Sequence, residues 1–496
     1  MAEKNQNLIV LGLDGATWDL VDPLIAAGEL PNFRQLKERG AWGEVKTAYL
    51  GSPVIWTAIF TGKDRDKFGD PFFGIDRARL RARRIWEIAA RQGLRIGVLH
   101  PLLTWPPLET DGFVIPDIFA MGPETYPSRY EPFQKLYLSR HGGNLLQQAY
   151  YFLRSFLLAG GPDVAFSALR FLISTALRPQ FLNTFRRRLE VVTRMDFRLF
   201  LKLHRTYRPR LCAFHLHAVD TVSHKYWQYK DKTGPYSGVI NNFYRLADRF
   251  LGRVMRRMDE DTSLVVLADH GFQEIQDERN KFELDVPVLR KLLEAGPDVR
   301  AVRIGNAYVA NLGSGVDSKA ASRMTGTLTG AVLEDGSSLF TNVHQIDQNI
   351  HFRLTRRILE SADPDAEEIS FADSEPIRFG QLFHRKTFVD TGTHAAGRGI
   401  FAAYGRRFRP GVHLDKVNIF DITPTLLALL GLPVARDMDG GVDRRWFTDQ
   451  SLQNLQIRSV DTYETEAADV SSAEEQAFSD QEVEDLEERL KTLGYL

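Results

Sequence analysis

Five short apolar runs, each bounded by polar or glycine-containing segments, constrain the fold of this chain more than any other feature. They span residues 8–14, 94–100, 211–217, 263–269 and 399–405. Longer amphipathic stretches lie between them, such as residues 30–40 and 241–260. Uninterrupted apolar runs are typical of strands buried on both faces, and strands that alternate with helices favour parallel pairing. We therefore predict an α/β fold with a largely parallel central sheet flanked by helices.

The composition excludes several classes of protein. The chain has 496 residues and a formal net charge of −1, so we expect no specific nucleic-acid binding. A single cysteine, Cys212, excludes an internal disulfide and fits a reducing compartment. The first apolar stretch is short and is interpreted as a strand, not a signal peptide. No run reaches the roughly 18 apolar residues of a membrane span, so we expect a cytoplasmic protein.

Changes in pattern along the chain predict an α/β core interrupted twice. The core segments are residues 1–124, 211–283 and 381–445, separated by a helical, basic cap insertion at 125–210 and a small α+β insertion at 284–380. The second insertion contains a predicted short sheet in VRAVRIGNAYVANLG. The expected architecture is an α/β core with these two insertions.

The final segment, residues 446–496, is predicted to be an acidic linker that ends in a helix. Residues 461–490 hold twelve acidic residues and one basic residue, which is typical of a solvated linker. Ser479 and Glu482 form a capping-box pattern, and an apolar stripe follows at helical spacing. We predict a short docking helix here.

The cap insertion is strongly basic. Residues 126–210 carry fifteen Lys and Arg against four Asp and Glu, and Arg186, Arg187 and Arg188 are consecutive. Four interpretations stay open: a solvated helix face, or a surface for a polyanionic substrate, an acidic lipid surface or the acidic tail. Apolar stretches with nearby arginines leave peripheral contact with an anionic membrane among the expectations.

Seven side chains have the composition of a two-metal phosphoryl-transfer site. They are Asp14, Ser52, Asp220, His224, Asp269, His270 and His394. Three carboxylates, three imidazoles and one hydroxyl could hold two divalent cations and present a nucleophile between them. Taken singly, Asp14 also fits a helix cap, and His394 fits a loop histidine at the surface. Only their convergence favours a site.

The positions of these residues relative to the predicted elements support convergence. Asp14 and the Asp269–His270 pair end apolar strands, and open α/β sheets place ligands at the carboxyl ends of their strands. The Ser52–Pro53 pair predicts a helix start with Ser52 as N-cap, where the helix dipole favours an ionised hydroxyl or a bound phosphate.

Three histidines lie close to Asp220 in the sequence: His215, His217 and His224. Asp220 and His224 are four residues apart, so a helix that begins near Asp220 would place both on one face. His215 and His217 lie on the preceding strand. We interpret those two as structural, because alternation places them on one face and no carboxylate partner is evident.

The order and context of these motifs resemble the type I phosphodiesterase/nucleotide pyrophosphatase family of the alkaline phosphatase superfamily. The matching stretches are LIVLGLDGATWDLVDPLIAAGELPNFRQLKERG, SPVIWTAIFTGK, VDTVSHKYWQY, VVLADHGF, GTHAAGRGIF and IFDITPTLLALLGLP. They cover roughly residues 7–120, 211–275 and 388–441. The cap and the 284–380 insertion match only weakly.

The resemblance implies an alkaline-phosphatase-like catalytic core and a role for each of the seven residues. Asp14, Ser52, Asp269 and His270 would bind one metal ion, and Asp220, His224 and His394 the other. Ser52 stands ten residues before Gly62, where the family keeps its nucleophile. The ligand set favours zinc, with manganese as the alternative. The implied activity is hydrolysis of a small-molecule phosphodiester or nucleotide pyrophosphate through a phosphoserine on Ser52.

Several short motifs of this chain differ from those of related families, and these differences bear on its alternative functions. Many relatives have Lys-His-Gly where this chain has Lys67-Phe68-Gly69, which leaves a substrate contact at Phe68 in doubt. Ser52-Pro53-Val54 does not fit the sulfatase motif, and Gly51 and Pro53 do not fit alkaline phosphatase itself. A phosphomonoesterase, a phosphotransferase related to phosphoglycerate mutase, and a non-catalytic scaffold for partner or membrane binding stay as alternatives.

Overall fold

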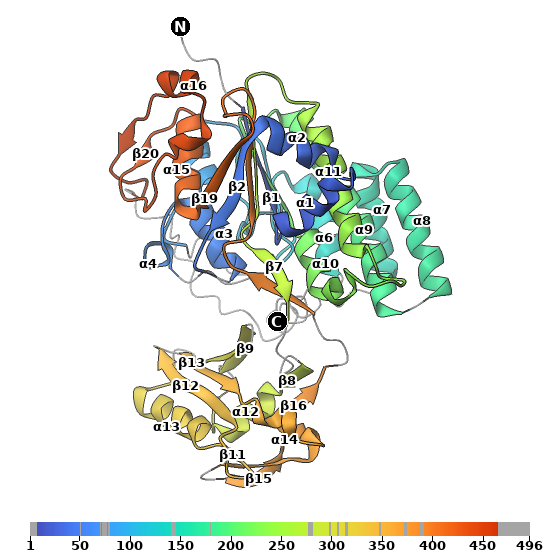
Figure 1. Cartoon of the computed structure of the whole chain (residues 1–496), viewed down its shortest axis with the longest axis vertical. Coiled ribbons are helices and arrows are strands. Elements are labelled where there is room, and N and C mark those ends of the chain that lie inside the picture. The colour runs from blue at the N-terminus through green and yellow to red at the C-terminus, as the bar shows by residue number, and fades with distance from the viewer. Residues whose placement is uncertain are drawn as a thin grey trace. The chain divides into compact units, whose positions relative to one another are not determined.

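The computed structural model describes residues 7–464, except for residues 50, 70, 72–76, 78–79, 140–144, 179, 276–280, 297–298, 305–306, 313–315, 347–348, 372–373 and 387–390. The chain forms two compact units, shown in Figure 1. Among these residues, the first unit combines the chain up to Gln273 with the chain from His394 to Glu464, and the second comprises Glu274–Thr393. The predicted C-terminal helix at residues 479–493 lies outside the described residues.

The first unit is built on an eight-stranded sheet. Its spatial order is β19 (Val412–Asn418), β2 (Gly40–Lys46), β18 (Ile400–Tyr404), β6 (Thr262–Leu267), β1 (Asn7–Leu13), β5 (Leu211–Leu216), β3 (Ile96–Leu99) and β4 (Phe113–Ile115). All neighbours pair in parallel except β18, which runs antiparallel to both β6 and β2. The prediction of an α/β fold with a largely parallel sheet is therefore confirmed.

Helices cover both faces of this sheet, as Figure 1 shows. Those outside the segment 131–207 are α1 (Trp18–Ala26), α2 (Pro31–Arg39), α3 (Ser52–Thr61), α4 (Arg65–Phe68), α5 (Ile85–Arg91), α10 (Ala218–Tyr226), α11 (Val239–Met255), α15 (Ile419–Leu429) and α16 (Asp449–Asn454). Short strands β20 (Val434–Ala435) and β21 (Ser459–Val460) pair in parallel beside them. No helix among the described residues combines the length and apolarity needed to cross a bilayer.

The two faces of β1 meet different helices because side chains alternate along a strand. Ile9, Leu11 and Leu13 belong to the hydrophobic core that includes α1, α2, α9 and α11. Gly12 points the other way, and a Cβ atom built on it would lie 2.8 Å from the Trp56 ring of α3. The absence of a side chain at Gly12 therefore lets α3 approach the strand closely.

The described part of residues 131–207 contains four helices: α6 (Glu131–Leu138), α7 (Leu145–Ala159), α8 (Pro162–Leu177) and α9 (Phe181–Tyr207). The last of them packs on the sheet, since Phe197 and Phe200 of α9 contact Phe214 of β5 at ring-centroid distances of 6.1 Å and 5.2 Å. This segment thus contributes to the main core of the first unit. The division of the chain into a core and a cap at residues 125–210 stays a prediction.

The second unit has its own hydrophobic core. Its larger sheet has the order β12 (Phe340–Ile346), β13 (Asn349–Leu354), β10 (Ala307–Asn311), β9 (Arg300–Ile304), with all neighbours antiparallel. The smaller sheets join β11 (Val332–Leu333), β14 (Glu368–Phe371) and β15 (Ser374–Arg378), and β16 (Phe383–Arg385) with β8 (Phe282–Leu284). Its helices are α12 (Val286–Leu292), α13 (Ser318–Thr329) and α14 (Phe379–Leu382). The short sheet expected in VRAVRIGNAYVANLG corresponds to the hairpin of β9 and β10.

Candidate metal centre

Asp14 is the first residue after β1, at the carboxyl edge of the sheet. Its backbone N–H donates to the carbonyl of Leu216 at 3.1 Å, which ties it to the end of the neighbouring strand β5. Gly15 follows with φ +68°, a left-handed conformation that glycine adopts without strain. The Gly15 N–H lies 3.4 Å from Oδ1 of Asp269, which itself follows β6. Parallel pairing of β1 and β6 thus brings two carboxylates together from positions 255 residues apart in the chain.

Ser52 is the first residue of α3, not its N-cap as the sequence predicts. Gly51 occupies the cap position, and no side chain closes the cap. A serine in the first turn can turn its hydroxyl away from the helix backbone. The Ser52 Oγ lies 3.1 Å from Nε2 of His270 and is buried. The hydroxyl therefore faces the carboxylate cluster.

His270 stands at the centre of the cluster. Its Nε2 lies 3.2 Å from Oδ2 of Asp269, 3.5 Å from Oδ1 of Asp14 and 4.0 Å from Oδ1 of Asp220. Its Nδ1 lies 3.0 Å from the carbonyl oxygen of Gly271, an acceptor that fixes the proton on Nδ1. Burial and the positive charge of His394 lower the pKa of His270 to about 3, so its Nε2 carries a lone pair at neutral pH.

Asp220 and His224 lie on one face of α10, as the four-residue spacing predicts. The Oδ1 atom of Asp220 lies 3.5 Å from Nε2 of both His224 and His394. The two Nε2 atoms are themselves 3.1 Å apart. His394 was expected in a loop, but it lies in β17 (Gly392–Ala395), which pairs with β7 (Gly271–Glu274) directly after His270. The strand pairing explains why the His270 and His394 rings stack at 3.6 Å.

The structure therefore brings all seven predicted side chains together. Three combinations place their ligand atoms within 4.8 Å of one another: Asp14, Asp269 and His270; Asp220, His270 and His394; and Asp14, His215 and His217. The second combination groups His270 with Asp220 and His394, whereas the family resemblance groups His224 with those two residues. His224 still adjoins it through the contacts to Asp220 and His394.

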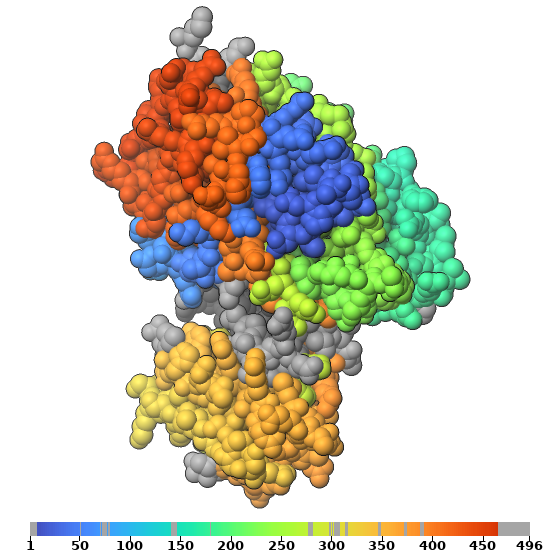
Figure 2. Space-filling model, viewed as in Figure 1, coloured from blue at the N-terminus to red at the C-terminus, as the bar shows by residue number. Residues whose placement is uncertain are grey.

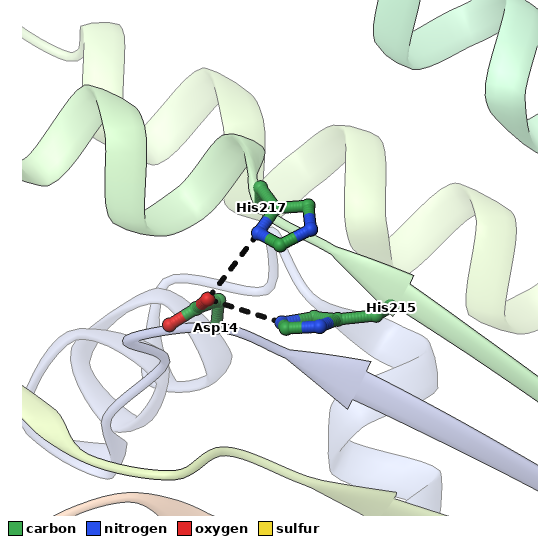
Figure 3. Close-up of side chains that lie close together, drawn as sticks. All are labelled: Asp14, His215 and His217. Carbon is green, nitrogen blue, oxygen red and sulfur yellow. Dashed lines mark hydrogen bonds and ion pairs between the residues drawn. The ribbon is translucent and has the colours of Figure 1, made fainter. Parts of the chain in front are cut away.

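His215 and His217 are the residues whose role the sequence interpretation missed. The Nε2 of His215 lies 3.0 Å from Oδ2 of Asp14, and the Nδ1 of His217 lies 3.4 Å from the same oxygen (Figure 3). The expectation that they lack a carboxylate partner is wrong, because parallel pairing places His215 beside Gly12, two residues before Asp14. The alternation of His-Leu-His on a strand next to an Asp-ended strand is the signal that could have found them.

The pKa values of the two histidines shift in opposite directions. Burial, assisted by the charge of His217, lowers the pKa of His215 to about 4, so its ring is neutral and donates Nε2–H to Asp14. Burial opposes the charged form of His217, yet its contact with Asp14 raises its pKa. Burial likewise opposes ionisation of Asp14, but hydrogen bonds from both histidines lower its pKa well below the usual value.

The pKa values of the other two carboxylates shift in opposite directions. Burial and the negative charge of Asp14 raise the pKa of Asp269 well above its usual value. Burial also opposes ionisation of Asp220, but the charge of His224 lowers its pKa. A protein core tolerates three adjacent carboxylates only when positive charge neutralises them.

These observations fit divalent cations. Neither oxygen of Asp220, nor Oδ2 of Asp269, accepts a hydrogen bond within the described part of the chain, although all three atoms are buried. Unsatisfied carboxylate oxygens beside a histidine lone pair are a donor set that divalent cations take in proteins. Phe68 stands where many relatives have the histidine of a Lys-His-Gly motif. Its side chain is fully buried, and it lies in α4.

Known phosphodiesterases are similar to part of this chain. The family model "Type I phosphodiesterase / nucleotide pyrophosphatase" matches residues 8–358. The chain is similar to Venom phosphodiesterase 2 of Crotalus adamanteus, with 34% identity over 88 residues, which is 17% of this chain and 10% of the relative. It is also similar to a venom phosphodiesterase of Naja atra, with 30% identity over 96 residues, 18% of this chain and 11% of the relative.

The aligned stretch thus spans about a tenth of the length of each of these relatives. The family model extends much further along the chain and covers more than half of its 496 residues. The protein therefore belongs to the type I phosphodiesterase/nucleotide pyrophosphatase family.

Proposed function

We propose that the protein is a metal-dependent hydrolase of phosphodiester or nucleotide pyrophosphate bonds. One observation carries this proposal: the hydroxyl of Ser52 lies against a buried cluster of three carboxylates and several imidazoles at the carboxyl edge of the sheet. Such a cluster has no packing function that apolar side chains would not fulfil better. Family membership agrees with it.

We assign the seven predicted residues to two divalent cations. Asp14, Ser52, Asp269 and His270 would hold one, and Asp220, His224 and His394 the other. Zinc is the favoured ion because imidazole nitrogens and carboxylate oxygens contribute together, and manganese is the alternative. When bound, the cations supply Lewis acidity, which lowers the pKa of a coordinated hydroxyl and neutralises charge on the phosphate.

Ser52 is the proposed nucleophile. Its position in the first turn of α3 places the positive end of the helix dipole beside the hydroxyl, which favours the alkoxide and an incoming phosphate. Attack of Oγ on phosphorus forms an O–P bond and breaks the bond to the leaving oxygen, which departs with the serine proton. Water then cleaves the phosphoserine, which restores the hydroxyl and releases the second product.

The neighbouring side chains would position these groups. Neutral His270 keeps its Nε2 lone pair toward the cluster because the Gly271 carbonyl holds the proton on Nδ1. His215 and His217 fix one oxygen of Asp14, which leaves the other directed toward His270. We propose this orientation as their contribution to the reaction.

The test is an activity screen of the purified full chain with zinc or manganese. The substrates are bis-p-nitrophenyl phosphate, p-nitrophenyl phosphate, dinucleotides and nucleoside triphosphates, with metal content measured in parallel. Preferential cleavage of the diester and of pyrophosphate bonds is the expected result. Faster cleavage of the monoester would replace the proposal with a phosphomonoesterase, and absence of both metal and turnover would support a scaffold.

We place the protein in the cytoplasm, with peripheral contact to anionic membrane through the basic residues 125–210. The support is the single cysteine, Cys212, which is free and buried, and the local excess of arginine. Fractionation of cells that express the full chain tests both parts. Recovery only from an oxidising compartment would contradict the first.

A further inference from the structure

The helices α7 and α8 expose apolar side chains to solvent on a scale found nowhere else in the described chain. Eleven large hydrophobic side chains are exposed among the described residues, and ten of them lie between Leu146 and Phe181. Leu146, Leu157, Leu172 and Leu177 are 83%, 72%, 63% and 75% exposed. A cluster of this size on one surface marks an interaction site.

The exposed residues form a stripe on each helix. On α7, Leu146, Tyr150, Leu153 and Leu157 recur at intervals of four, three and four residues, which is helical spacing. The opposite sides of both helices are occupied, since residues such as Phe156 and Val164 pack into the core of the first unit. Figure 1 shows α8 at the outer edge of the helical layer, and Figure 2 shows its surface on the outside of the unit.

The charge around these stripes has one sign. Between residues 145 and 188 there are six arginines and one acidic residue, Asp163. Asp163 is already neutralised by a salt bridge of 2.8 Å to Arg198. The apolar surface therefore has a cationic border.

A basic pocket of about 240 Å³ adjoins the α8 stripe. Helices α8, α9 and α11 line it with six arginines, Arg170, Arg186, Arg187, Arg194, Arg245 and Arg249, and with one carboxylate, Glu190. Glu190 binds Arg194 at 2.9 Å and Arg187 at 3.3 Å, while Arg245 binds Glu29. Arg170 and Arg249 are exposed. The lining therefore keeps a large excess of positive charge.

Two N–H groups of this pocket have no hydrogen-bond acceptor among the described residues. The Nε–H groups of Arg186 and Arg187 are buried and donate to no acceptor in the described part of the structure. Burial and the charges of Arg186 and Arg170 lower the pKa of Arg187, as expected where several cations share one carboxylate, Glu190. A phosphate oxygen is the acceptor that guanidinium groups bind best.

We propose that this face of the first unit docks on an anionic phospholipid bilayer. The arginine pocket binds the phosphate of a lipid headgroup, and the stripes of α7 and α8 enter the boundary between headgroups and acyl chains. Arg170 joins the two parts, because it lines the pocket and lies next to the exposed Leu169 on α8. Helices that lie in the interface combine an apolar face with arginines in this way.

The charge distribution favours lipid over a second copy of the chain. A two-fold symmetric dimer through this face would bring arginines against arginines, with Asp163 already paired. A small free phosphate would satisfy the pocket and leave the apolar stripes in water. An anionic bilayer accounts for both features. Bilayer docking deepens the membrane contact proposed above for residues 125–210, and it involves none of the proposed catalytic residues.

Flotation of the full chain with vesicles tests the proposal. Vesicles of phosphatidylcholine with phosphatidylglycerol should carry the protein, and pure phosphatidylcholine vesicles should carry at least tenfold less. The double variants Leu169→Asp/Leu172→Asp and Arg170→Glu/Arg249→Glu should each reduce binding to the anionic vesicles more than tenfold. These four side chains are exposed, so the variants should fold, which unchanged thermal unfolding checks.

Matched controls lie elsewhere on the protein. Ile457→Asp changes the one exposed large hydrophobic residue outside the helical segment among those described, and Arg436→Glu reverses an exposed charge. Both should bind like the unaltered protein, and so should Ser52→Ala, which separates docking from hydrolysis. Absence of flotation with anionic vesicles would overturn the proposal. Two other results would also overturn the proposal. One is loss of vesicle binding by Arg170→Glu/Arg249→Glu while Leu169→Asp/Leu172→Asp still binds. The other is self-association of the chain that Leu169→Asp/Leu172→Asp abolishes.

Discussion

Nε2 of His215 lies 3.0 Å from Oδ2 of Asp14, and both side chains are completely enclosed by the protein. The pair joins neighbouring strands β1 and β5 at residues 201 positions apart in the chain. A hydrogen bond to one carboxylate oxygen restricts rotation of Asp14 and directs Oδ1, which lies 3.5 Å from His270, toward the cluster. Partners of this kind tune metal ligands in many proteins.

Replacing His215 with alanine should therefore weaken metal binding or turnover. The expected loss is about 10- to 100-fold in either quantity, the usual effect of removing a residue that orients a metal ligand. His215→Gln keeps a donor and should recover part of the loss. Zinc titration and kcat/KM measure the effect. The matched control is His384→Ala, which removes an exposed histidine 2.7 Å from Asp285; equal behaviour of the two alanine variants would refute the role.

Ser52→Ala should abolish turnover and leave metal content unchanged. The hydroxyl is the proposed nucleophile, so its removal should lower kcat by at least about 10³-fold. The remaining carboxylates and imidazoles should still retain the ions. Ser167→Ala, which removes a buried hydroxyl bonded to the carbonyl of Asp163, is the control and should keep full activity. Undiminished activity of Ser52→Ala would remove this residue from the mechanism.

Chelation should lower the melting temperature of the protein. Without cations the carboxylates of Asp14, Asp220 and Asp269 repel one another inside the core, whereas ions that bind only the folded state stabilise it. At a free ion concentration of 100 times Kd the stabilisation is about 2.7 kcal/mol. Thermal unfolding with a chelator, with zinc and with manganese measures it. Asp220→Asn should reduce the response, and identical melting curves in all conditions would contradict a metal centre.

Gly12→Ala should impair both stability and activity. The new methyl group would lie 2.8 Å from the Trp56 ring and would displace α3, the helix that carries Ser52. Overpacking of a core typically costs about 1–3 kcal/mol. Chemical denaturation and kcat measure the two effects. Gly326→Ala, a helical position with open space around it, is the control and should be neutral or stabilising.

The buried pair of Arg84 and Glu87 should make stability depend on pH. Burial opposes ionisation of Glu87, but the charge of Arg84, 2.5 Å away, lowers the pKa of Glu87 below its usual value. A carboxylate with a lowered folded pKa stabilises the fold above its unfolded pKa and loses this contribution as pH falls through the folded pKa.

Glu87→Gln therefore should reduce the free energy of unfolding at pH 7 by about 3 kcal/mol, because it leaves Arg84 buried without its counter-ion. The difference from the unaltered protein should shrink as the pH falls through the folded pKa of Glu87. Urea denaturation across the acidic range measures it. Asp22→Asn breaks an exposed pair with Lys37 and should cost less than about 1 kcal/mol at every pH. A pH-independent difference for Glu87→Gln would refute the assignment.

The sequence by itself determined the strands and the residues at their ends. Largely apolar runs identified β1, β3, β5, β6 and β18, because a strand buried on both faces is filled mainly by apolar side chains. Asp14 and Asp269 follow two of these runs directly. Since parallel strands end at one edge of a sheet, the position of both carboxylates followed from local pattern alone.

The tertiary structure decided which partners these residues have. The apolar pattern of residues 399–405 does not encode direction, and only the pairing shows that β18 runs antiparallel to β6. The register of β5 against β1 places His215 beside Gly12, which gives Asp14 the partner that the sequence concealed. Packing of α9 on the sheet likewise decided which sides of α7 and α8 are buried. A local pattern fixes the period of an element, whereas its partners come from contacts between distant residues, which no single segment specifies.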